Sequence, residues 1–413
     1  MKKVIFFVKK FPILSQTFVI DQVNNLIDAG VDVEILSLYE AKQDVALDSL
    51  KKHKLLHRTT FIAPTMAQST KKPIKLLFLI KFFVLVNTIE TRLKPSMELA
   101  FHALKHGKLT LAYEISVTAW KNRKRQFKAD SIIAHFGNNG VVANAFLKSG
   151  LLEGNLMTVF HGYEISEYEN IKLWKDRYVS LSRTSLLLPI SNFWKRRLES
   201  WGATSESVIV QRMGVDVSKF AFQTKQVEKP VQIVSVARAT EKKGLKYAIE
   251  AMSFLDDNFH LNIIGGGELH NDLIQLSEKL NLSDKITFHG AKPPQFVKEC
   301  LNKSDIFLLP SVVDSQGDME GIPVALMEAM ASGLTVVSTY HSGIPELIED
   351  NVSGFLVPER DPKAIAEALK KVMTTDKLND IRRQAREKVE KEFNSFTLSN
   401  ELVALIESSS RLT

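Results

Sequence analysis

The sequence predicts an α/β protein made of two doubly wound domains with parallel sheets. Short apolar runs alternate with longer amphipathic stretches, and this series of signals starts afresh near the middle of the chain. The length of 413 residues also exceeds that of an ordinary single domain. With 45% hydrophobic and 24% charged residues, the composition excludes a disordered chain or a fibre. The single cysteine, Cys300, excludes an internal disulfide or a cysteine-rich zinc site and favours the reducing cytoplasm.

Five strands are expected in the first half of the chain, each from a short apolar run. They are Lys3–Val8, Asp32–Leu38, Ser131–His135, Met157–Phe160 and Leu186–Ile190. The N-terminal run Val4–Val8 is shorter than the roughly 7–15 apolar residues of a signal-peptide core, and lysines follow it, so it predicts a buried strand. No uncharged apolar stretch of about 18 residues occurs, so no membrane-spanning helix is expected.

A second series of strand and helix signals begins after residue 230. Strands are expected at Val231–Val236, His260–Ile264, Lys285–Phe288, Ile306–Leu309 and Thr335–Ser338, and helices at Leu245–Met252, Leu269–Leu280, Pro294–Lys303, Pro323–Ala331 and Pro362–Thr374. We place the domain boundary near Gly214, which gives domains of residues 1–214 and 215–395, and we expect the polar stretch 222–230 to be irregular. The last segment, 396–413, has the apolar spacing of a helix but no predicted docking partner.

Positive charge is concentrated in one segment. The chain has a formal net charge of +7, yet residues 41–130 alone hold 18 basic against 6 acidic residues, whereas residues 211–413 hold 24 against 29. Charge separated in this way predicts a basic surface directed at a polyanion, either a membrane or a nucleic acid.

Within this segment, residues 71–86 (KKPIKLLFLIKFFVLV) resemble a helix that lies in a membrane interface. Leucine and phenylalanine bulk is flanked and interrupted by lysines, and the stretch is too short to span a bilayer. In that case Phe78, Phe82 and Phe83 are expected to contact the membrane. A helix that packs into the core with its lysines in solvent is an equally open alternative. The basic cluster 121–125 (KNRKR) is better explained as a solvated face.

Three consecutive glycines follow an expected strand and precede an expected helix. Gly265, Gly266 and Gly267 begin the pattern of a dinucleotide fingerprint, but the third glycine position of that pattern holds His270. The fingerprint is therefore incomplete. Because glycines at the carboxyl edge of a parallel sheet permit close approach of a ligand, we expect them to form a wall of a nucleotide pocket rather than an NAD site.

The segment 318–333 (DMEGIPVALMEAMASG) contains two glutamates eight positions apart. Glu320 precedes the expected helix and Glu328 lies on its second turn. The residues that form the helix start are Gly321, Ile322, Pro323 and Val324. Free N–H groups and the positive end of the helix dipole favour an anion there. Carboxylates on either side of such a site suggest hydroxyl-rich groups flanking a diphosphate, as in a nucleotide sugar. Local pairing of Glu328 on an exposed helix face is the alternative.

Two cations, Arg238 and Lys243, follow the first strand of the second series at its carboxyl edge. A guanidinium can form paired hydrogen bonds with phosphate oxygens, and an ammonium supplies a point charge. Single surface cations are usually inert, but a pair at this edge of the sheet predicts a phosphate site.

Together these motifs resemble the retaining glycosyltransferases of family 4, which have the GT-B fold of two Rossmann-like domains facing across a cleft. The resemblance covers nearly all of residues 231–374 and includes the segment 342–346 (SGIPE). In the first half, residues 11–18 (FPILSQTF), 134–137 (AHFG), 158–164 (TVFHGYE) and 212–216 (RMGVD) are similar to the branch that builds exopolysaccharides of the colanic acid and amylovoran type. Many family members carry paired glycines after the first strand, where this chain has Leu14-Ser15-Gln16, so the acceptor-side loop departs from the family pattern.

The resemblance implies a role for each candidate site residue. Glu328 would bind the ribose hydroxyls and Glu320 the hydroxyls of the donor sugar. Arg238 and Lys243 would hold the diphosphate, and His161 would face the donor sugar from the other domain. In retaining enzymes of this type the departing phosphate takes the proton of the acceptor hydroxyl, so no protein nucleophile is expected. No D-x-D motif occurs, and the two cations can replace a divalent ion, so we expect no metal or other cofactor.

The sequence therefore predicts a glycosyltransferase that moves a hexose from UDP-glucose or UDP-galactose to a lipid-diphosphate-linked oligosaccharide, bound peripherally to an anionic membrane on its cytoplasmic face. A GDP-mannose-dependent mannosyltransferase and a nucleotide-sugar 2-epimerase of the same fold remain alternatives. The 2-epimerase needs no membrane acceptor, which the basic segment disfavours. A nucleic-acid-binding protein is also disfavoured, because the half that carries the phosphate motifs is net negative and no aromatic–basic binding motif occurs.

Overall fold

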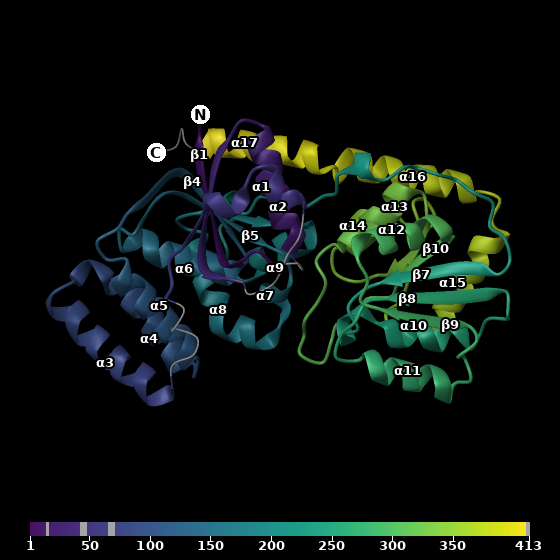
Figure 1. Ribbon diagram of the computed structural model, residues 1–413, viewed down its shortest axis with the longest axis horizontal. Coiled ribbons are helices and arrows are strands. Elements are labelled where there is room, and N and C mark those ends of the chain that lie inside the picture. Colours follow the sequence, from purple (N-terminus) through teal and green to yellow (C-terminus); the bar gives the residue numbers. More distant parts are fainter. Residues whose placement is uncertain (14–15, 42–47, 65–70, 410–413) are drawn as a thin grey trace.

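The computed structural model describes residues 1–13, 16–41, 48–64 and 71–409. The described residues form two parallel sheets of six strands each, both flanked by helices. Figure 1 shows the two sheets in separate halves of the molecule, with the last two helices running along the top of both. The predicted architecture of two doubly wound α/β domains is confirmed.

The first domain contains the following strands and helices. Its sheet consists of β1 (Lys3–Phe11), β2 (Asp32–Glu40), β3 (Thr59–Phe61), β4 (Phe127–His135), β5 (Leu152–Phe160) and β6 (Leu186–Pro189). Its helices are α1 (Thr17–Asp28), α2 (Asp48–Lys52), α3 (Lys72–Thr88), α4 (Lys94–Lys105), α5 (Leu109–Lys121), α6 (Gly137–Lys148), α7 (Tyr163–Ser166), α8 (Tyr168–Leu181) and α9 (Asn192–Ser200).

The second domain repeats this pattern. Its sheet consists of β7 (Val231–Val236), β8 (Phe259–Ile264), β9 (Ile286–Gly290), β10 (Ile306–Leu309), β11 (Thr335–Thr339) and β12 (Phe355–Val357). The remaining helices are α10 (Leu245–Met252), α11 (His270–Lys279), α12 (Pro294–Lys303), α13 (Val324–Ser332), α14 (Ile344–Leu347), α15 (Pro362–Thr374), α16 (Leu378–Glu392) and α17 (Ser395–Ser409).

The inner strands are continuous apolar runs because both faces of each sheet are covered. Residues Val4–Val8 of β1 and all of β10 are buried, as a strand between two helical layers requires. Every expected strand is present. The two strands that were not expected, β3 and β12, are three residues long and lie at the sheet edges.

The strand order reverses once in each sheet. The first sheet has the order β3-β2-β1-β4-β5-β6 and the second the order β12-β11-β10-β7-β8-β9. The chain therefore winds outwards in opposite directions from β1 and β4 in the first sheet, and from β7 and β10 in the second. Because ligands of doubly wound sheets bind beyond the carboxyl ends of the strands at such a reversal, each domain has one expected ligand position.

The chain crosses between the domains at two adjacent points. The Val215 N–H donates to the Phe393 carbonyl and the Ser395 N–H to the Val215 carbonyl, both at 2.9 Å. A Cβ on Gly214 would lie 2.1 Å from the Phe393 oxygen, so only glycine fits there. One hydrophobic core draws its residues from Val4–Met213 together with Leu402 and Ile406, and the other from Val215–Phe393.

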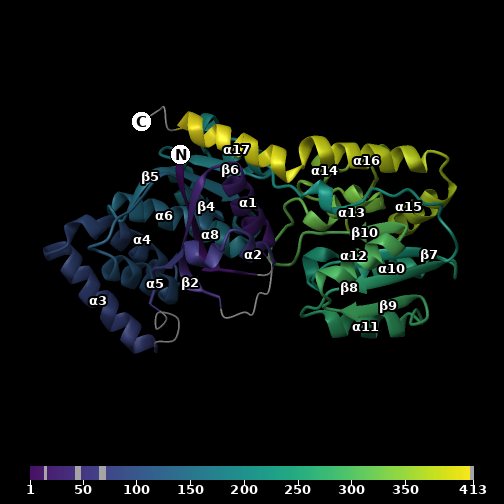
Figure 2. The same ribbon diagram turned by 45° about the horizontal axis from the view of Figure 1, so that its top comes forward.

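The last helix returns to the first domain. α17 lies along α1, and its residues Leu402 and Ile406 belong to the first hydrophobic core. Figure 2 shows α16 over the second domain and α17 over the first. The C-terminal segment, for which the sequence predicted no docking partner, therefore completes the N-terminal domain.

Three helices, α3, α4 and α5, form the outer end of the first domain (Figures 1 and 2). On the outward sides of α3, aliphatic side chains are 47–58% exposed: Ile74, Leu76, Leu77, Ile80 and Val84. The expectation that its phenylalanines face outwards is wrong. Phe82 is 1% exposed, and Phe78 and Phe83 are half-buried against the core. No helix in the described part of the chain is both long and apolar enough to cross a bilayer.

Candidate active site

Arg238 and Lys243 lie where the strand order of the second sheet reverses. The loop after β7 carries Arg238, which is exposed, and then a 3-10 turn that ends at Lys243. Gly244 follows with φ 65°, and a Cβ there would lie 1.8 Å from the Pro310 carbonyl oxygen in the loop after β10. The loops of the neighbouring strands β7 and β10 are thus packed together at the predicted phosphate site.

A buried cluster of opposite charges joins these two loops. Lys243 Nζ lies 2.9 Å from Glu320 Oε2, and Lys242 Nζ lies 3.7 Å from Glu320 Oε1 and 2.8 Å from Asp318 Oδ2. Lys243 and Glu320, which the sequence assigned to different parts of the donor, therefore contact each other directly. The roles of Lys242 and Asp318 were missed, although both lie next to residues that the motifs singled out.

The charges of this cluster depend on one another. Burial raises the pKa of Glu320, but the ammonium groups of Lys243 and Lys242 outweigh it and hold that pKa below the ordinary value. Burial likewise lowers the pKa of Lys242, whereas Glu320 and Asp318 outweigh it and raise that pKa. Both shifts favour the ionised forms of Glu320 and Lys242 at neutral pH.

A helix begins between the two glutamates as predicted, but its first residue lies one position later than expected. α13 begins at Val324, and Pro323 is its N-cap residue rather than part of its first turn. Ile322 and Pro323 are buried, and Ser342 Oγ donates to the carbonyl oxygens of Glu320 and Gly321 at 2.6 and 2.9 Å. The segment 320–323 is thereby fixed at the N-terminal end of α13, where backbone N–H groups favour an anion.

Gly265 and Gly267 hold the loop of Arg238 rather than opening space for a ligand. Their φ values are 138° and 152°, and a Cβ on Gly265 would lie 1.9 Å from the Ala237 oxygen, while one on Gly267 would lie 2.6 Å from the Ala239 oxygen. The two carbonyl groups flank Arg238 in the chain. At Gly266, by contrast, a Cβ would make only one ordinary contact at 3.8 Å, so this position has open space beside it.

Glu328 projects from α13 towards the first domain. Burial and the Asp21 carboxylate of α1 raise the pKa of Glu328 to about 7, which Lys219 partly offsets. Its carboxylate has no hydrogen-bond partner among the described residues. The alternative of local pairing on an exposed helix face is therefore not what the structure contains.

The raised pKa of Glu328 predicts a pH dependence of nucleotide binding. In the role that the family resemblance implies for Glu328, a ribose hydroxyl would donate to the ionised carboxylate, so we expect the affinity for UDP to rise about tenfold between pH 6 and pH 8 as Glu328 loses its proton. Calorimetric titrations of the wild type and of Glu328→Gln at several pH values test this. Because UDP itself titrates in this range, the difference between the two profiles is the readout, and parallel profiles would contradict the assignment.

The same shift affects the stability of the fold. The folded-state pKa of Glu328, about 7, lies above the ordinary glutamate pKa of 4.5. The stability that the protonated carboxyl contributes is therefore complete below the unfolded-state pKa and is lost as the pH rises through 7.

His161 lies at the junction of the two domains. A Cβ on Gly321 would lie 2.3 Å from the His161 carbonyl oxygen, so the two loops are in direct contact. The imidazole packs between Phe18 and Phe136, with ring centres 4.8 and 4.6 Å away, and its Nε2 lies 3.0 Å from His135 Nδ1. Burial lowers the pKa of His161 well below its ordinary value, so the ring is neutral.

A buried carboxyl group shapes the His161 loop. Glu164, which is fully buried, accepts the His161 N–H at 2.7 Å and the Gly137 N–H at 3.4 Å. Burial raises its pKa to about 7. Sequence reasoning quoted Glu164 only as part of a motif, because its partner Gly137 lies 27 residues earlier in the chain.

A second contact between the domains uses the SGIPE segment. Glu346 accepts the backbone N–H groups of Asn192 and Phe193 at 2.9 and 2.8 Å, at the N-terminal end of α9, and Arg212 donates to it at 3.3 Å. A carboxylate of one domain thereby caps a helix of the other. In the described part of the chain, no three side chains of His, Cys, Asp or Glu are grouped to hold a metal ion.

Two Rossmann-like domains, with two partly buried lysines, a carboxylate and a helix start gathered at their junction, are the arrangement of a GT-B glycosyltransferase. The family model of glycosyl transferases group 1 matches residues 216–390. Over 98% of this chain and 99% of each relative, the sequence is 40% identical to WcaL of Escherichia coli (strain K12), a glycosyltransferase assigned to colanic acid biosynthesis, and 38% identical to the amylovoran biosynthesis glycosyltransferase AmsK of Erwinia amylovora. The chain therefore belongs to the family of colanic acid and amylovoran glycosyltransferases.

Solved structures agree with this fold. The structure of Anabaena Alr3699/HepE in complex with UDP and glucose superposes with a TM-score of 0.69, over 99% of this chain and 100% of that chain, at 16% sequence identity. At this identity the likeness shows the fold alone.

Proposed function

We propose that this glycosyltransferase transfers a hexose, with retention of its anomeric configuration, from UDP-glucose or UDP-galactose to a lipid-diphosphate-linked oligosaccharide of exopolysaccharide biosynthesis. The observation that carries the proposal is the cluster of Lys243, Lys242 and Glu320 beside Arg238, at the ligand edge of the second sheet. Both relatives named above are glycosyltransferases of exopolysaccharide synthesis, and HepE was solved with UDP and glucose.

Each domain has its own part in this proposal. Residues 215–395 bind the nucleotide sugar, residues 1–214 bind the acceptor, and residues 396–409 pack on the acceptor side. In the donor site, Arg238 and Lys243 bind the diphosphate, Glu320 binds the sugar hydroxyls and Glu328 the ribose. Gly266 and the helix start Gly321-Ile322-Pro323-Val324 line the pocket, and Gly265 and Gly267 keep the Arg238 loop in place.

The transfer step follows from these positions. Departure of the nucleoside diphosphate builds negative charge on its outer phosphate, which Arg238, Lys243 and the N–H groups of α13 stabilise. The acceptor hydroxyl attacks the anomeric carbon of the sugar on the face from which the phosphate leaves, and it gives its proton to the departing phosphate. His161, which is neutral and lies on the first domain's side of the junction, faces the donor sugar in this proposal. The cations already supply the charge that a metal would bring, so we propose that transfer needs no metal or other cofactor.

The donor is tested by incubating the protein with UDP-glucose, UDP-galactose and GDP-mannose in excess EDTA and measuring slow hydrolysis. We expect hydrolysis of one of the UDP-sugars, release of the α-anomer, and no loss of rate with EDTA. Exclusive use of GDP-mannose would assign the mannosyltransferase, and conversion of a UDP-sugar to its 2-epimer would assign the epimerase. Loss of activity in EDTA with rescue by magnesium or manganese would contradict metal independence.

We further propose that the protein binds peripherally to an anionic membrane on its cytoplasmic face, through α3. Five outward aliphatic side chains of this helix are exposed, and the exposed lysines Lys71, Lys72 and Lys81 accompany them. Apolar bulk with flanking lysines fits an anionic bilayer surface, and a nucleic acid has no use for the aliphatic side chains.

The membrane surface predicts a salt-resistant part of binding. We expect the wild type to sediment with vesicles that contain phosphatidylglycerol, but not with neutral vesicles, and high salt should reverse this only in part, because salt screens charges but not buried apolar groups. Replacing Leu77, Ile80 and Val84 with serine should abolish the salt-resistant fraction while leaving donor hydrolysis unchanged.

The matched control replaces three exposed residues of the second domain, Phe254, Tyr340 and Val352, with serine. This variant should sediment like the wild type. If both triple variants behave alike, or if the wild type binds no vesicles at any salt concentration, α3 is not a membrane surface.

A further inference from the structure

The first domain contains a cavity that the donor site does not use. Its volume is about 640 Å³, and it lies between the carboxyl ends of β1 and β2, the start of α6, and helices α3, α5 and α8. Lys9 and Asn138 line it, one at the end of β1 and the other after β4. It therefore occupies the reversal point of the first sheet, as the Arg238 loop does in the second. By the same argument it is the expected ligand position of this domain.

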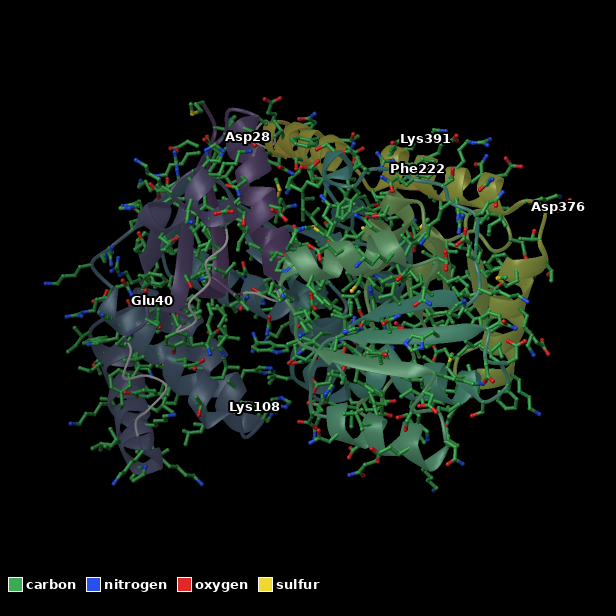
Figure 3. All side chains as sticks on the ribbon, turned by 45° about the vertical axis from the view of Figure 1, so that its right-hand side comes forward. Asp28, Glu40, Lys108, Phe222, Asp376 and Lys391 are labelled. Atoms are coloured by element: carbon green, nitrogen blue, oxygen red, sulfur yellow. The ribbon has the colours of Figure 1, made fainter. Side chains whose placement is uncertain are left out.

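Four lysines line this cavity, and two of them lack a carboxylate partner in the described part of the chain. Lys9 pairs with Glu114 at 3.3 Å, and Lys108, labelled at the lower edge of the first domain in Figure 3, pairs with Glu169 at 3.4 Å. Within the described residues no ion pair forms with Lys72 or Lys75. The cavity thus has an excess of positive charge.

Lys75 is the decisive residue. It is 6% exposed, and its Nζ donates to Thr110 Oγ1 at 3.2 Å and lies 5.9 Å from the centre of the Tyr113 ring. A buried ammonium without a carboxylate is costly unless another anion compensates it. Nothing in the fold requires a lysine there, because its neighbours on the same side of α3, Leu79 and Phe82, are apolar. The position therefore indicates an anionic ligand.

The start of α5 adds neutral donors to these cations. Along this helix, the first backbone N–H with a backbone acceptor is that of Ala112, which donates to the carbonyl of the N-cap residue Lys108 at 3.0 Å. The amides of Leu109, Thr110 and Leu111 have no acceptor among the described residues, and all three residues line the cavity. Backbone N–H groups beside two unpaired ammonium groups suit a phosphate better than a carboxylate, because a phosphate offers more acceptor oxygens.

One chain of hydrogen bonds links the cavity to the active site. Asn139, which lines the cavity and is 7% exposed, donates to the His135 carbonyl at 2.8 Å. His135 in turn contacts His161 at the domain junction. On the other side, Lys72 and Lys75 belong to α3, whose outward sides carry the exposed aliphatic residues. The cavity therefore lies between the proposed membrane surface and the proposed transfer site.

We propose that this cavity binds the diphosphate of the lipid-linked acceptor, with Lys72 and Lys75 as its principal cations. This rests on the proposed function for the identity of the acceptor. The lipid chain leaves along α3 and the saccharide extends past Asn139 towards His161. Because Asn139 is so close to the histidine pair, only a short saccharide separates the diphosphate from the hydroxyl that reacts.

Geranyl diphosphate is the probe, and calorimetry at saturating UDP is the measurement, because UDP occupies the donor site. If GDP is the nucleotide that binds, GDP takes its place. We expect one further binding event in the wild type, weakened about tenfold or more in Lys75→Met and in Lys72→Met, since each loses a charged hydrogen bond to phosphate. Methionine keeps the bulk of the buried Lys75, and Lys72 is exposed, so at least the second variant should fold. Lys105→Met, an exposed lysine of α4 outside the cavity, is the matched control and should bind like the wild type.

Three further ligands identify what the cavity recognises. Geraniol, which lacks phosphate, should not bind, and inorganic pyrophosphate should bind more weakly than geranyl diphosphate. Equal affinity for geranyl diphosphate and pyrophosphate would overturn the lipid-linked source of the ligand. If the cavity binds glucuronate but not geranyl diphosphate, its ligand is an acidic sugar and the proposed diphosphate is wrong. Unchanged affinity in both lysine variants would overturn the site itself. Failure of UDP and GDP to bind would count against the proposed function, while the geranyl diphosphate titration would still decide the cavity.

Discussion

Lys243→Ala is expected to lower the transfer rate by about 10²-fold, the scale of losing one group that stabilises charge in the transition state. The Lys243 side chain is 17% exposed and its Nζ lies 2.9 Å from Glu320 Oε2, so it acts in a site that largely excludes water. Glu320→Ala should cost as much, because it removes the proposed ligand of the sugar and leaves Lys242 and Lys243 without the carboxylate that they share. Initial rates of transfer, measured with saturating donor, test both changes.

The matched control is Lys246→Ala, three residues further along the chain. Its side chain is 60% exposed and pairs with Glu250 outside the donor site, so its removal should leave the rate unchanged. The double variant of Lys243 and Glu320 should lose less than the product of the two single losses, because the two side chains interact. Near-native rates in both single variants would show that the donor phosphate is bound elsewhere.

Gly321→Ala is the second change with a large expected effect. A Cβ at Gly321 would lie 2.3 Å from the His161 carbonyl oxygen and 2.5 Å from Ile190 Cδ1, and both residues belong to the other domain. The clash should therefore push the domains apart by about an ångström and lower the rate by about 10²-fold, as small misplacements of reacting groups do. Each domain core remains intact, so the thermal unfolding temperature should change little.

The control for Gly321 is Gly150→Asn in the turn after α6. That position has φ 69° and nothing within 4 Å of an added Cβ, and asparagine tolerates this backbone conformation. Its rate should match the wild type. If Gly321→Ala instead unfolds the protein, the contact supports folding rather than the position of the two domains.

The fold could be predicted because strands buried on both faces leave a visible pattern. A short, fully apolar run such as Val4–Val8 or Ile306–Leu309 is typical of a strand that is buried between two helical layers. The strands β3 and β12 left no such pattern, since three residues are too few and their place depends on the neighbouring strand. The side of α3 that faces the core could not be predicted either. A helix that is apolar on all sides does not show which side faces its neighbours, so Phe82 was expected outside and is buried.

In the site, individual residues could be predicted from the sequence, but the contacts between them could not. Lys243 and Glu320 were both singled out, but they are 77 positions apart, and only the packing of the β7 and β10 loops brings them together. The adjacent Lys242 gave no signal of its own, although it bridges Glu320 and Asp318. Glu346 was likewise quoted in a motif, while the two amides that it caps lie 154 and 153 residues earlier.

The return of α17 to the first domain has a consequence for how the chain is made. A ribosome adds about 5–20 residues per second, so roughly 20–80 s pass between the appearance of α1 and that of Leu402 and Ile406. During this time the second domain can complete its core, while the first, although synthesised earlier, still lacks part of its own. The domain that is synthesised first is thus the last to complete its hydrophobic core. A stop codon that removes only α17 therefore takes residues from the core of the N-terminal domain.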